Sequence, residues 1–481
     1  MTSDPPTIPD GLVVVVKREC ETCQTVVPVL AQLDAAADLT VYTQDDPGFP
    51  GDPAAIHDAE LAVSWHHDIE TVPTLVRVVD GAEVERTVGW HRPEWERVTG
   101  VENLGEDLPP MRPGCGSMSV DPDKVDELRA RFTGDVLRSR RIDVAEAEDD
   151  IEMMFTRGWA DGLPVVPPTP ERVLAMLQGT SRDPSEVVAV VPPDLVECTV
   201  EKVAIAAVMA GCRPEYLPWV LTAVEAACND EFNMHGLLCT TMPVSPILVC
   251  SGPGTRAIGM NSEGNALGQG NRANSTIGRA LQLLVRNVGG GRPGEIDKAT
   301  HGSPGKVGFC FAENDAESPF GRLAGEHGID DGVDAVTVFA GEGTRIVFDQ
   351  QSRDPDSLAR TFASCLLSVS HPKLVLKFDA IVVIGPEHAR VFAEAGWGRE
   401  RIVAEINGHT VRDAADLVRG VDGIAEGLPA PFGGIGDVPK FRDGGLMLAY
   451  AGGGAGLFSE VIGGWVNGDE GSEPVTRAVH Y

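Results

Sequence analysis

Two cysteines separated by two residues, Cys20 and Cys23, have the spacing of a redox-active dithiol. They follow the β-branched run Gly11–Lys17, which predicts a buried strand, and precede an apolar pattern typical of a helix. Backbone N–H groups and the helix dipole stabilise a thiolate at a helix N-terminus. We therefore expect Cys20 to be the nucleophile and Cys23 to resolve a mixed disulfide formed on it.

Metal binding is the other chemistry open to a CxxC pair. Ten cysteines in 481 residues do not make a disulfide scaffold. Zinc would need two more ligands, for which His66 and His67 are the candidates, but this arrangement lacks a zinc-finger spacing. We expect no metal, and no cofactor beyond a redox-active Cys20–Cys23 disulfide. The remaining interpretation is a module that has kept both cysteines without using them.

Further features recur at set separations from the dithiol. They are Pro28, the Thr-Val-Pro-Thr loop Thr71–Thr74, the hairpin signal Asp80-Gly81 and Gly89. With the element order β-α-β then ββ-α, this pattern over residues 1–104 resembles the thioredoxin family. The resemblance implies a thioredoxin-like α/β fold in which a cis-proline, Pro73, packs against the dithiol as part of the catalytic site.

The sequence departs from the thioredoxin pattern at two places. Arg18 and Glu19 stand where the family usually has an aromatic residue, and the apolar run Val13–Val16 replaces a buried acidic residue. We therefore expect a dithiol that serves one attached partner rather than a general disulfide reductase.

Gly and Pro are frequent after residue 104, which predicts a linker over residues 105–120. A charged helical connector is expected next, with helical runs at Val125–Phe132 and Val144–Phe155, so that residues 105–150 join two domains. Cys115 lies in this expected linker. It could be a relay that carries electrons between the domains, or an idle exposed thiol.

Strand-like and helical runs alternate over residues 151–481, which predicts a large α/β domain with a mixed sheet flanked by helices. The expected strands are Val187–Val191, Ile247–Val249, Ala335–Phe339, Leu374–Leu376, Ala380–Ile384 and Leu446–Ala449. The expected helices are Lys202–Ala210, Leu217–Ala227, Ile277–Val288, Leu358–Leu367 and His388–Ala395.

A loop rich in glycine and asparagine, Ser251–Arg279, separates an expected strand from an expected helix in this domain. A Gly-rich loop that leads into a helix N-terminus can hold an anion. Asn274, Ser275 and Thr276 resemble an N-cap cluster. The substrate-binding candidates are Asn271, Arg272, Asn274, Ser275 and Thr276. The alternative is a structural loop whose asparagines satisfy one another.

The charged segment Gly289–Asn314 holds a second set of candidates. Arg292 and Lys306 could bind a substrate, and His301 and Glu313 could act as acid and base. Cys310 could be a nucleophile or a redox partner, or simply a small apolar residue between two phenylalanines.

A third segment, Gly452–Trp465, follows an expected strand and is expected to open a helix. Its glycines Gly453 and Gly454 could hold a phosphate or carboxylate, or form a tight packed turn.

The large domain also resembles an uncharacterised bacterial family associated with proteins that carry a cysteine- or selenocysteine-Gly-Ser-Cys motif. The segments that carry this resemblance are Arg157–Val173, Glu201–Pro218, Gly270–Ala280, Arg292–Lys306 and Gly385–Ala389. The association implies a redox role and no particular reaction.

The net charge of -33 disfavours nucleic acids and anionic membranes as partners. The N-terminus lacks the basic and apolar regions of a secretion signal, and the run Gly11–Val16 is too short to span a membrane, so a cytoplasmic location is expected. The expected partners are a small-molecule substrate, a thiol reductant and further copies of the chain.

Together these features predict a thiol-dependent oxidoreductase in which the dithiol serves a fused catalytic domain acting on a small, possibly anionic substrate. The alternative is a non-redox lyase or hydrolase that uses His301 and Glu313, with the thioredoxin-like domain as regulator or docking module. A binding or assembly protein is the third hypothesis.

Overall fold

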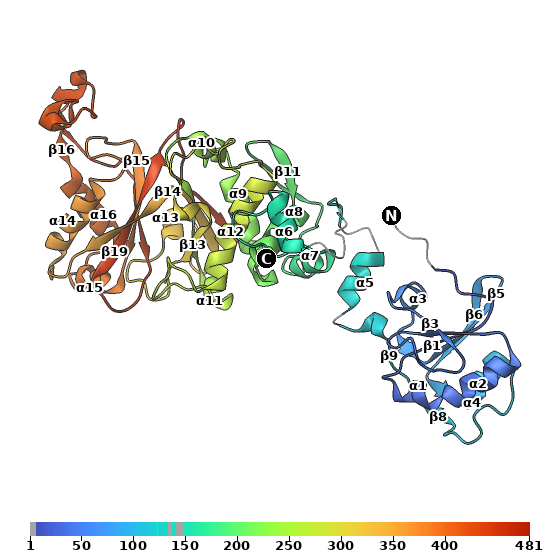
Figure 1. Cartoon of the computed structure of the whole chain (residues 1–481). Coiled ribbons are helices and arrows are strands. Elements are labelled where there is room, and N and C mark those ends of the chain that lie inside the picture. Colours follow the sequence, from blue (N-terminus) through green and yellow to red (C-terminus); the bar gives the residue numbers. More distant parts are fainter. Residues whose placement is uncertain (1–5, 123, 133–136, 141, 143–148) are drawn as a thin grey trace. The chain divides into compact units, whose positions relative to one another are not determined.

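The computed structural model describes residues 6–122, 124–132, 137–140, 142 and 149–481. The chain forms two compact units, Met1–Arg138 and Ser139–Tyr481 (Figure 1). The division falls at residue 138, inside the expected connector 105–150.

The first unit is built on a five-stranded sheet in the order β3-β2-β1-β5-β6. The strands are β1 (Gly11–Val16), β2 (Leu39–Thr43), β3 (Ala55–His57), β5 (Thr74–Val79) and β6 (Ala82–Val88). β1, β2 and β3 are parallel, whereas β5 runs antiparallel to β1 and pairs with β6. Because β1 is central and both of its faces are covered, it reads as an unbroken apolar run.

Four helices flank this sheet: α1 (Glu21–Thr25), α2 (Val27–Ala36), α3 (Ala62–His66) and α4 (Arg92–Thr99). Pro28 lies in the first turn of α2, where its missing N–H is harmless, and Val26 separates α1 from α2. Trp90 and Trp95 are fully buried beside them and meet edge to face, with ring centroids 5.3 Å apart. The expected β5–β6 hairpin turns at Asp80 and Gly81, both with positive φ.

The segment expected as a linker differs from that expectation, because residues 105–122 pack onto the first unit. Two short strands, β8 (Met111–Arg112) and β9 (Cys115–Gly116), pair with β7 (Trp90–His91) and β4 (Thr71–Val72). A 3-10 turn (Met118–Val120) and α5 (Val125–Phe132) follow. Helix α5 confirms one predicted helical run. Part of the other falls on residues 143–148, outside the described residues, and α6 (Asp150–Thr156) covers its end.

The second unit contains a mixed seven-stranded sheet in the order β13-β12-β14-β19-β15-β18, with β20 also paired to β14. Its strands are β12 (Ser245–Ser251), β13 (Phe309–Ala312), β14 (Ala335–Phe348), β15 (Phe378–Ile384), β18 (Leu446–Tyr450), β19 (Phe458–Val466) and β20 (Val475–Ala478). Only β12–β13 and β15–β18 are parallel pairs. The mixed sheet flanked by helices is as predicted.

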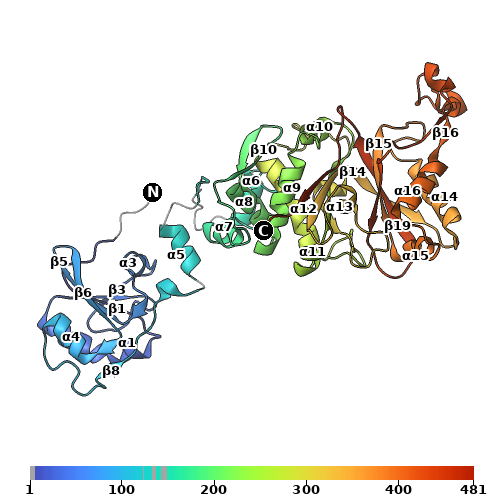
Figure 2. The same ribbon diagram turned by 180° about the vertical axis from the view of Figure 1, so that it is seen from behind.

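Helices cover this sheet at both ends of the unit (Figures 1 and 2). α7 (Pro170–Leu177), α8 (Val200–Ala210), α9 (Leu217–Ala227) and α12 (Arg272–Asn287) lie on the side of β12 and β13, whereas α14 (Pro355–Leu366), α15 (Pro386–Glu394) and α16 (Arg399–Thr410) lie on the side of β15 and β18. Shorter helices are α10 (Met234–Cys239), α11 (Pro253–Ala257) and α13 (Leu323–Glu326).

The two edge strands of this sheet meet where the Asn314 N–H donates to the Tyr450 carbonyl at 2.8 Å. The sheet is therefore curled, and apolar side chains from both of its halves form one buried cluster, which includes Ile247, Phe311 and Ile381. A separate hairpin, β10 (Val187–Val191) with β11 (Val196–Thr199), lies beside the helices.

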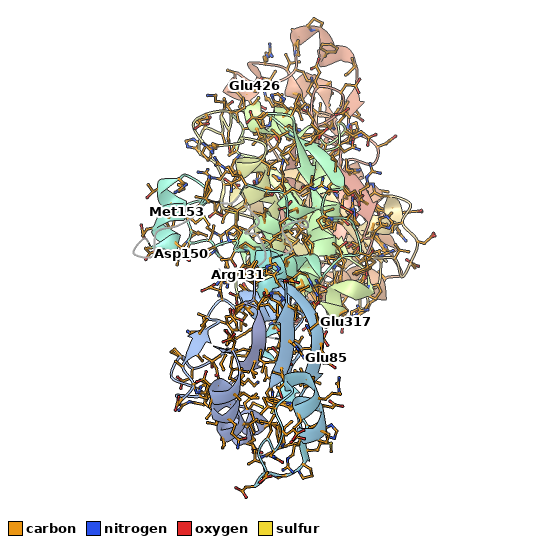
Figure 3. The ribbon with its side chains drawn as sticks, turned by 90° about the vertical axis from the view of Figure 1, so that its right-hand side faces the viewer. Glu85, Arg131, Asp150, Met153, Glu317 and Glu426 are labelled. Carbon is orange, nitrogen blue, oxygen red and sulfur yellow. The ribbon has the colours of Figure 1, made fainter. Side chains whose placement is uncertain are left out.

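A small lobe follows α16, with strands β16 (Arg412–Asp413) and β17 (Asp437–Val438) and three 3-10 turns between them. Its own apolar cluster includes Ala414, Leu417 and Val438. Glu426, labelled in Figure 3, marks this lobe.

Two predictions in the second unit are wrong. Leu374–Leu376 is not a strand but an irregular segment, in which Val375 packs into the apolar cluster of the small lobe. The segment after Gly452 leads into strand β19 and not into a helix, because Phe458–Val466 pairs with both β14 and β15.

Candidate functional site

The dithiol lies where β1 gives way to α1. Cys20 is the N-cap of α1, with extended backbone angles, and its Sγ accepts a hydrogen bond from the Cys23 N–H at 3.3 Å. Cys23 lies inside α1, one turn on. The helix start therefore presents its free N–H groups to the Cys20 sulfur, as the sequence predicts.

The two thiols differ in acidity although both have 0% of their surface exposed. The pKa of Cys20 is lowered to about 5, mainly because its sulfur accepts a hydrogen bond from the Cys23 thiol. Burial opposes this shift, whereas hydrogen bonds from the Cys115 thiol and from the Cys23 and Thr22 N–H groups add to it. Burial, together with the hydrogen bond to Cys20, raises the pKa of Cys23 far above its usual range. These opposite shifts favour the thiolate form of Cys20 and the thiol form of Cys23 at neutral pH.

The cis-proline loop lies against the same sulfur. The Val72–Pro73 peptide bond is cis, and the Val72 carbonyl oxygen lies 3.4 Å from the Cys20 Sγ. The Pro73 carbonyl accepts a hydrogen bond from the Gly89 N–H at 2.7 Å, which ties this loop to the end of β6.

A third thiol completes this group, and the expected linker supplies it. The Cys115 Sγ lies 2.8 Å from the Cys20 Sγ. Strand β9 pairs with β4 through Val72 and Cys115, and the Thr22 hydroxyl donates to the Pro113 carbonyl at 2.6 Å. Burial and the hydrogen bond to Cys20 raise the pKa of Cys115. Cys115 is therefore not an exposed linker thiol but a member of the dithiol site.

Contacts on both sides of β9 hold Cys115 in place. Upstream, Arg112 forms an ion pair with Glu21 and donates to the Thr25 hydroxyl at 2.8 Å. Downstream, the Ser117 N–H donates to the Glu70 carbonyl at 2.9 Å, and the buried Gln44 side chain donates to the Ser117 hydroxyl at 2.6 Å. These anchors went unpredicted because a two-residue strand carries no periodicity in the sequence.

The asparagine-rich loop of the second unit is largely satisfied by its own side chains. The N-cap of α12 is Asn271, which accepts from the Asn274 N–H at 3.0 Å, so the helix begins earlier than expected. Asn274 is buried and bonds to the backbone of Asn261 and Ala266. The alternative of a structural loop describes these two residues best.

The other substrate-binding candidates of this loop have varied surroundings. The Arg272 guanidinium donates to the carbonyls of Gly211 and Cys212 at the C-terminal end of α8. The Thr276 hydroxyl donates to the Arg272 carbonyl at 2.8 Å, and Ser275 is exposed.

The charged segment is divided between buried and exposed positions. Lys306 forms a half-buried ion pair with Asp297 at 2.9 Å, and Arg292 has a buried Nε without a partner among the described residues. His301 lies exposed on the loop before β13. The structure does not bring it into contact with Glu313, whose surroundings are entirely internal.

Glu313 is 2% exposed and joins three elements through its carboxylate. Its oxygens accept from the Leu323 N–H at 2.9 Å and the Tyr450 N–H at 3.4 Å. Burial raises the pKa of Glu313 to about 7, although Arg399 and the two N–H groups oppose this. These contacts assign Glu313 to holding β13, α13 and β18 together.

Cys310 has a neighbour that the sequence did not predict. Its Sγ lies 3.7 Å from the Cys250 Sγ on the adjacent strand, and both residues are buried. The hydrogen bond with Cys250 and burial raise the pKa of Cys310 well above its usual range, so this thiol stays protonated. The pair packs as two apolar groups in the core.

Gly453 and Gly454 lie in the turn between β18 and β19. An added Cβ at Gly453 would come 3.1 Å from Gly264 Cα, so this turn packs against the asparagine-rich loop. The tight packed turn is therefore the better description of Gly453, and no helix N-terminus follows it.

The described residues contain one group with the composition of a metal site, Asp356, Glu405 and His409, on the outer surface of α14 and α16. Asp356 already pairs with Arg360 at 2.9 Å. None of these residues belongs to the sites predicted from the sequence.

The sequence matches no protein-family model and no curated protein at a significant level. Among the described residues, none of the helices is long and apolar enough to cross a membrane. The two family resemblances expected from the sequence therefore stay predictions.

Proposed function

We propose that the first unit is a thioredoxin-like thiol–disulfide exchange module, and that the whole chain is a thiol-dependent oxidoreductase. The observation that carries this proposal is the opposite shift of two neighbouring thiols. The pKa of Cys20 is lowered to about 5 while that of Cys23 is raised. The element order of the sheet and the place of the Val72 carbonyl beside the Cys20 sulfur support the same assignment.

The proposed reaction is reduction of a substrate disulfide. The Cys20 thiolate attacks one substrate sulfur, an S–S bond forms to Cys20, and the other substrate sulfur leaves as a thiolate. The Cys23 thiol then loses its proton to the first departing thiolate and attacks the Cys20 sulfur, so that a Cys20–Cys23 bond forms, the bond between Cys20 and the substrate breaks, and the second substrate sulfur leaves as a thiolate. The substrate gains two electrons, the dithiol becomes a disulfide, and an external thiol restores it.

We assign the substrate, a small molecule, to the second unit. Linking the two units in one chain makes their exchange intramolecular, for which effective concentrations of about 1 mM are typical. The alternative, a lyase or hydrolase, would need an acid–base pair other than His301 and Glu313, because Glu313 accepts from backbone N–H groups and His301 lies exposed elsewhere.

The ultraviolet absorbance of the thiolate tests the lowered pKa of Cys20, and it does not require a reagent to reach the buried sulfur. We expect a thiolate that titrates near pH 5 in the reduced full chain and is lost in Cys20→Ser. We also expect dithiothreitol-dependent reduction of oxidised glutathione above the uncatalysed rate, lost in Cys20→Ser and retained in Cys239→Ser, which removes an exposed thiol outside the site. A thiolate that titrates only near the ordinary cysteine pKa, or glutathione reduction unchanged in Cys20→Ser, would contradict the proposal.

A further inference from the structure

The dithiol is closed to solvent by the chain itself. Cys20 and Cys23 have 0% of their surface exposed, whereas Cys115 is half-buried. A thiol or disulfide outside the protein can therefore meet Cys115 directly, whereas it reaches Cys20 only in molecules in which β9 has separated from β4.

Strand β9 is held in this position by backbone pairing and by side-chain contacts on both sides of it. Its two residues pair with Thr71 and Val72, and both flanks carry the anchors described above. An added Cβ at Gly114 would lie 2.8 Å from the Val72 carbonyl oxygen and closer still to the Thr71 side chain. Only a glycine lets the backbone approach β4 closely enough to bring the sulfur of Cys115 to that of Cys20.

We propose that Cys115 is a third redox cysteine of this site, which exchanges disulfides with Cys20 and so connects the buried dithiol to thiols outside. This inference rests on the proposed function. The arrangement that carries it is a central sulfur, Cys20, with a buried partner on one side and a half-exposed partner 2.8 Å away on the other.

The inner step transfers a disulfide without net oxidation. The Cys115 thiol gives up its proton and attacks the Cys20 sulfur of a Cys20–Cys23 disulfide. A Cys20–Cys115 bond forms, the Cys20–Cys23 bond breaks, and Cys23 leaves and takes up a proton. The raised pKa of Cys23 makes it a poor leaving group, so this step is the slow one.

The outer step uses an external dithiol, or two molecules of a monothiol such as glutathione. One external thiolate attacks the Cys115 sulfur and expels Cys20 as a thiolate. This departure is favoured because Cys20 has the lowest pKa of the three thiols. The second external thiolate attacks the mixed disulfide and releases Cys115. The external thiols lose two electrons and form a disulfide, while the site returns to its reduced state.

The test uses the reduced full chain with Cys23→Ser, treated with one equivalent of oxidised glutathione. Free thiols are then alkylated and the disulfides mapped by mass spectrometry. We expect a Cys20–Cys115 disulfide as the main product, with both glutathione moieties released. In Cys23→Ser combined with Cys115→Ser, glutathione should stay attached to Cys20. Cys239→Ser added to Cys23→Ser is the matched control and should leave the Cys20–Cys115 product unchanged.

A chain with Cys23→Ser that keeps glutathione on either cysteine, without a Cys20–Cys115 disulfide, would overturn the inference. Cys23→Ala repeats the test with a smaller side chain should the serine disturb the core. Cys115→Ser separates the two proposals, because it should still form the Cys20–Cys23 disulfide. Failure of that disulfide refutes the proposed function, whereas failure of the Cys20–Cys115 disulfide alone refutes the third redox cysteine.

Discussion

Replacing Gly114 with alanine should open the dithiol site. In the closed site, Cys20 has no exposed surface, so an alkylating reagent can reach it only when β9 separates from β4. The new methyl group of Gly114→Ala would lie 2.8 Å from the Val72 carbonyl oxygen and 3.3 Å from Gly89 Cα, and closer still to Thr71. Backbone atoms cannot turn aside as a flexible side chain can, so the two-residue pairing must give way.

The size of the effect follows from the cost of overpacking. An extra methyl group forced into a well-packed position costs about 1–3 kcal/mol. If that cost falls on the closed state, the fraction of open molecules rises by about 5-fold to about 150-fold, at about 1.4 kcal/mol per tenfold change. The rate of Cys20 alkylation at neutral pH should rise by the same factor, as long as closing is faster than alkylation.

The assay is mass-spectrometric measurement of iodoacetamide modification at Cys20 in the reduced full chain. Gly116→Ala is the matched control, because an added Cβ there has no atom within 4 Å. It should leave the alkylation rate close to that of the wild type. Equal rates in Gly114→Ala and the wild type would refute the view that β9 controls access to Cys20.

Three further predictions concern acidity and stability. Cys115→Ala removes a hydrogen bond that lowers the pKa of Cys20, so the thiolate absorbance should titrate at a higher pH than the value of about 5 in the wild type; an unchanged midpoint would contradict this. Burial raises the pKa of Glu313 from 4.5 to about 7, so ionising this carboxyl group destabilises the folded state. The free energy of unfolding of the wild type, measured relative to that of Glu313→Gln, should therefore fall between about pH 4.5 and pH 7 and stay level above pH 7. A difference between the two proteins that does not depend on pH would refute this assignment. Arg279→Ala leaves the half-buried Asp161 without its bidentate partner, with which it forms two 2.8 Å hydrogen bonds, and should cost about 3 kcal/mol in denaturant unfolding; a loss below about 1 kcal/mol would show that water replaces the pair.

Local patterns predicted the elements that are long and apolar. Helix α9 begins and ends at the expected residues, and β12, β15 and β18 contain the expected runs, because each is bounded by turn residues and buried on its faces. Strand β13 went unpredicted, since Phe309–Ala312 is short and lies among charged and glycine-rich residues. Such a strand is defined by its neighbour β12 and not by its own sequence.

Glycines misled the prediction for β19. The glycines at Gly453 and Gly454 were expected to open a helix, but strand β19 follows them, with Gly463 and Gly464 inside it. An added Cβ at Gly464 would lie 2.8 Å from the Asp379 carbonyl oxygen, and one at Gly463 would meet the Glu342 carboxylate. Close approach between strands depends on the assembled sheet. The local sequence is therefore compatible both with glycines that open a helix and with glycines inside a strand.

The candidate site was predictable only in part, for the same reason. The CxxC spacing and its place between a strand and a helix predicted Cys20 and Cys23. The place of Cys115 depends on the pairing of β4 with β9, two very short strands that lie far apart in the chain. Neither strand is long enough to show a periodic pattern of apolar residues in the sequence. A glycine on each side of Cys115 was the one local sign that its backbone meets another closely.

Disulfides join sulfurs in pairs, and the first unit gathers three sulfurs at one point. Any oxidised state formed within this site therefore leaves one sulfur unpaired. In the state with a Cys20–Cys115 disulfide, the unpaired sulfur is that of Cys23, which is buried and has a raised pKa, so reagents in solvent find no reactive thiol at this site. When Cys115 is unpaired, a half-exposed thiol faces the solvent. The two oxidised states contain the same number of electrons, but only one of them leaves a half-exposed thiol. A reagent outside the protein therefore distinguishes which two cysteines form the disulfide.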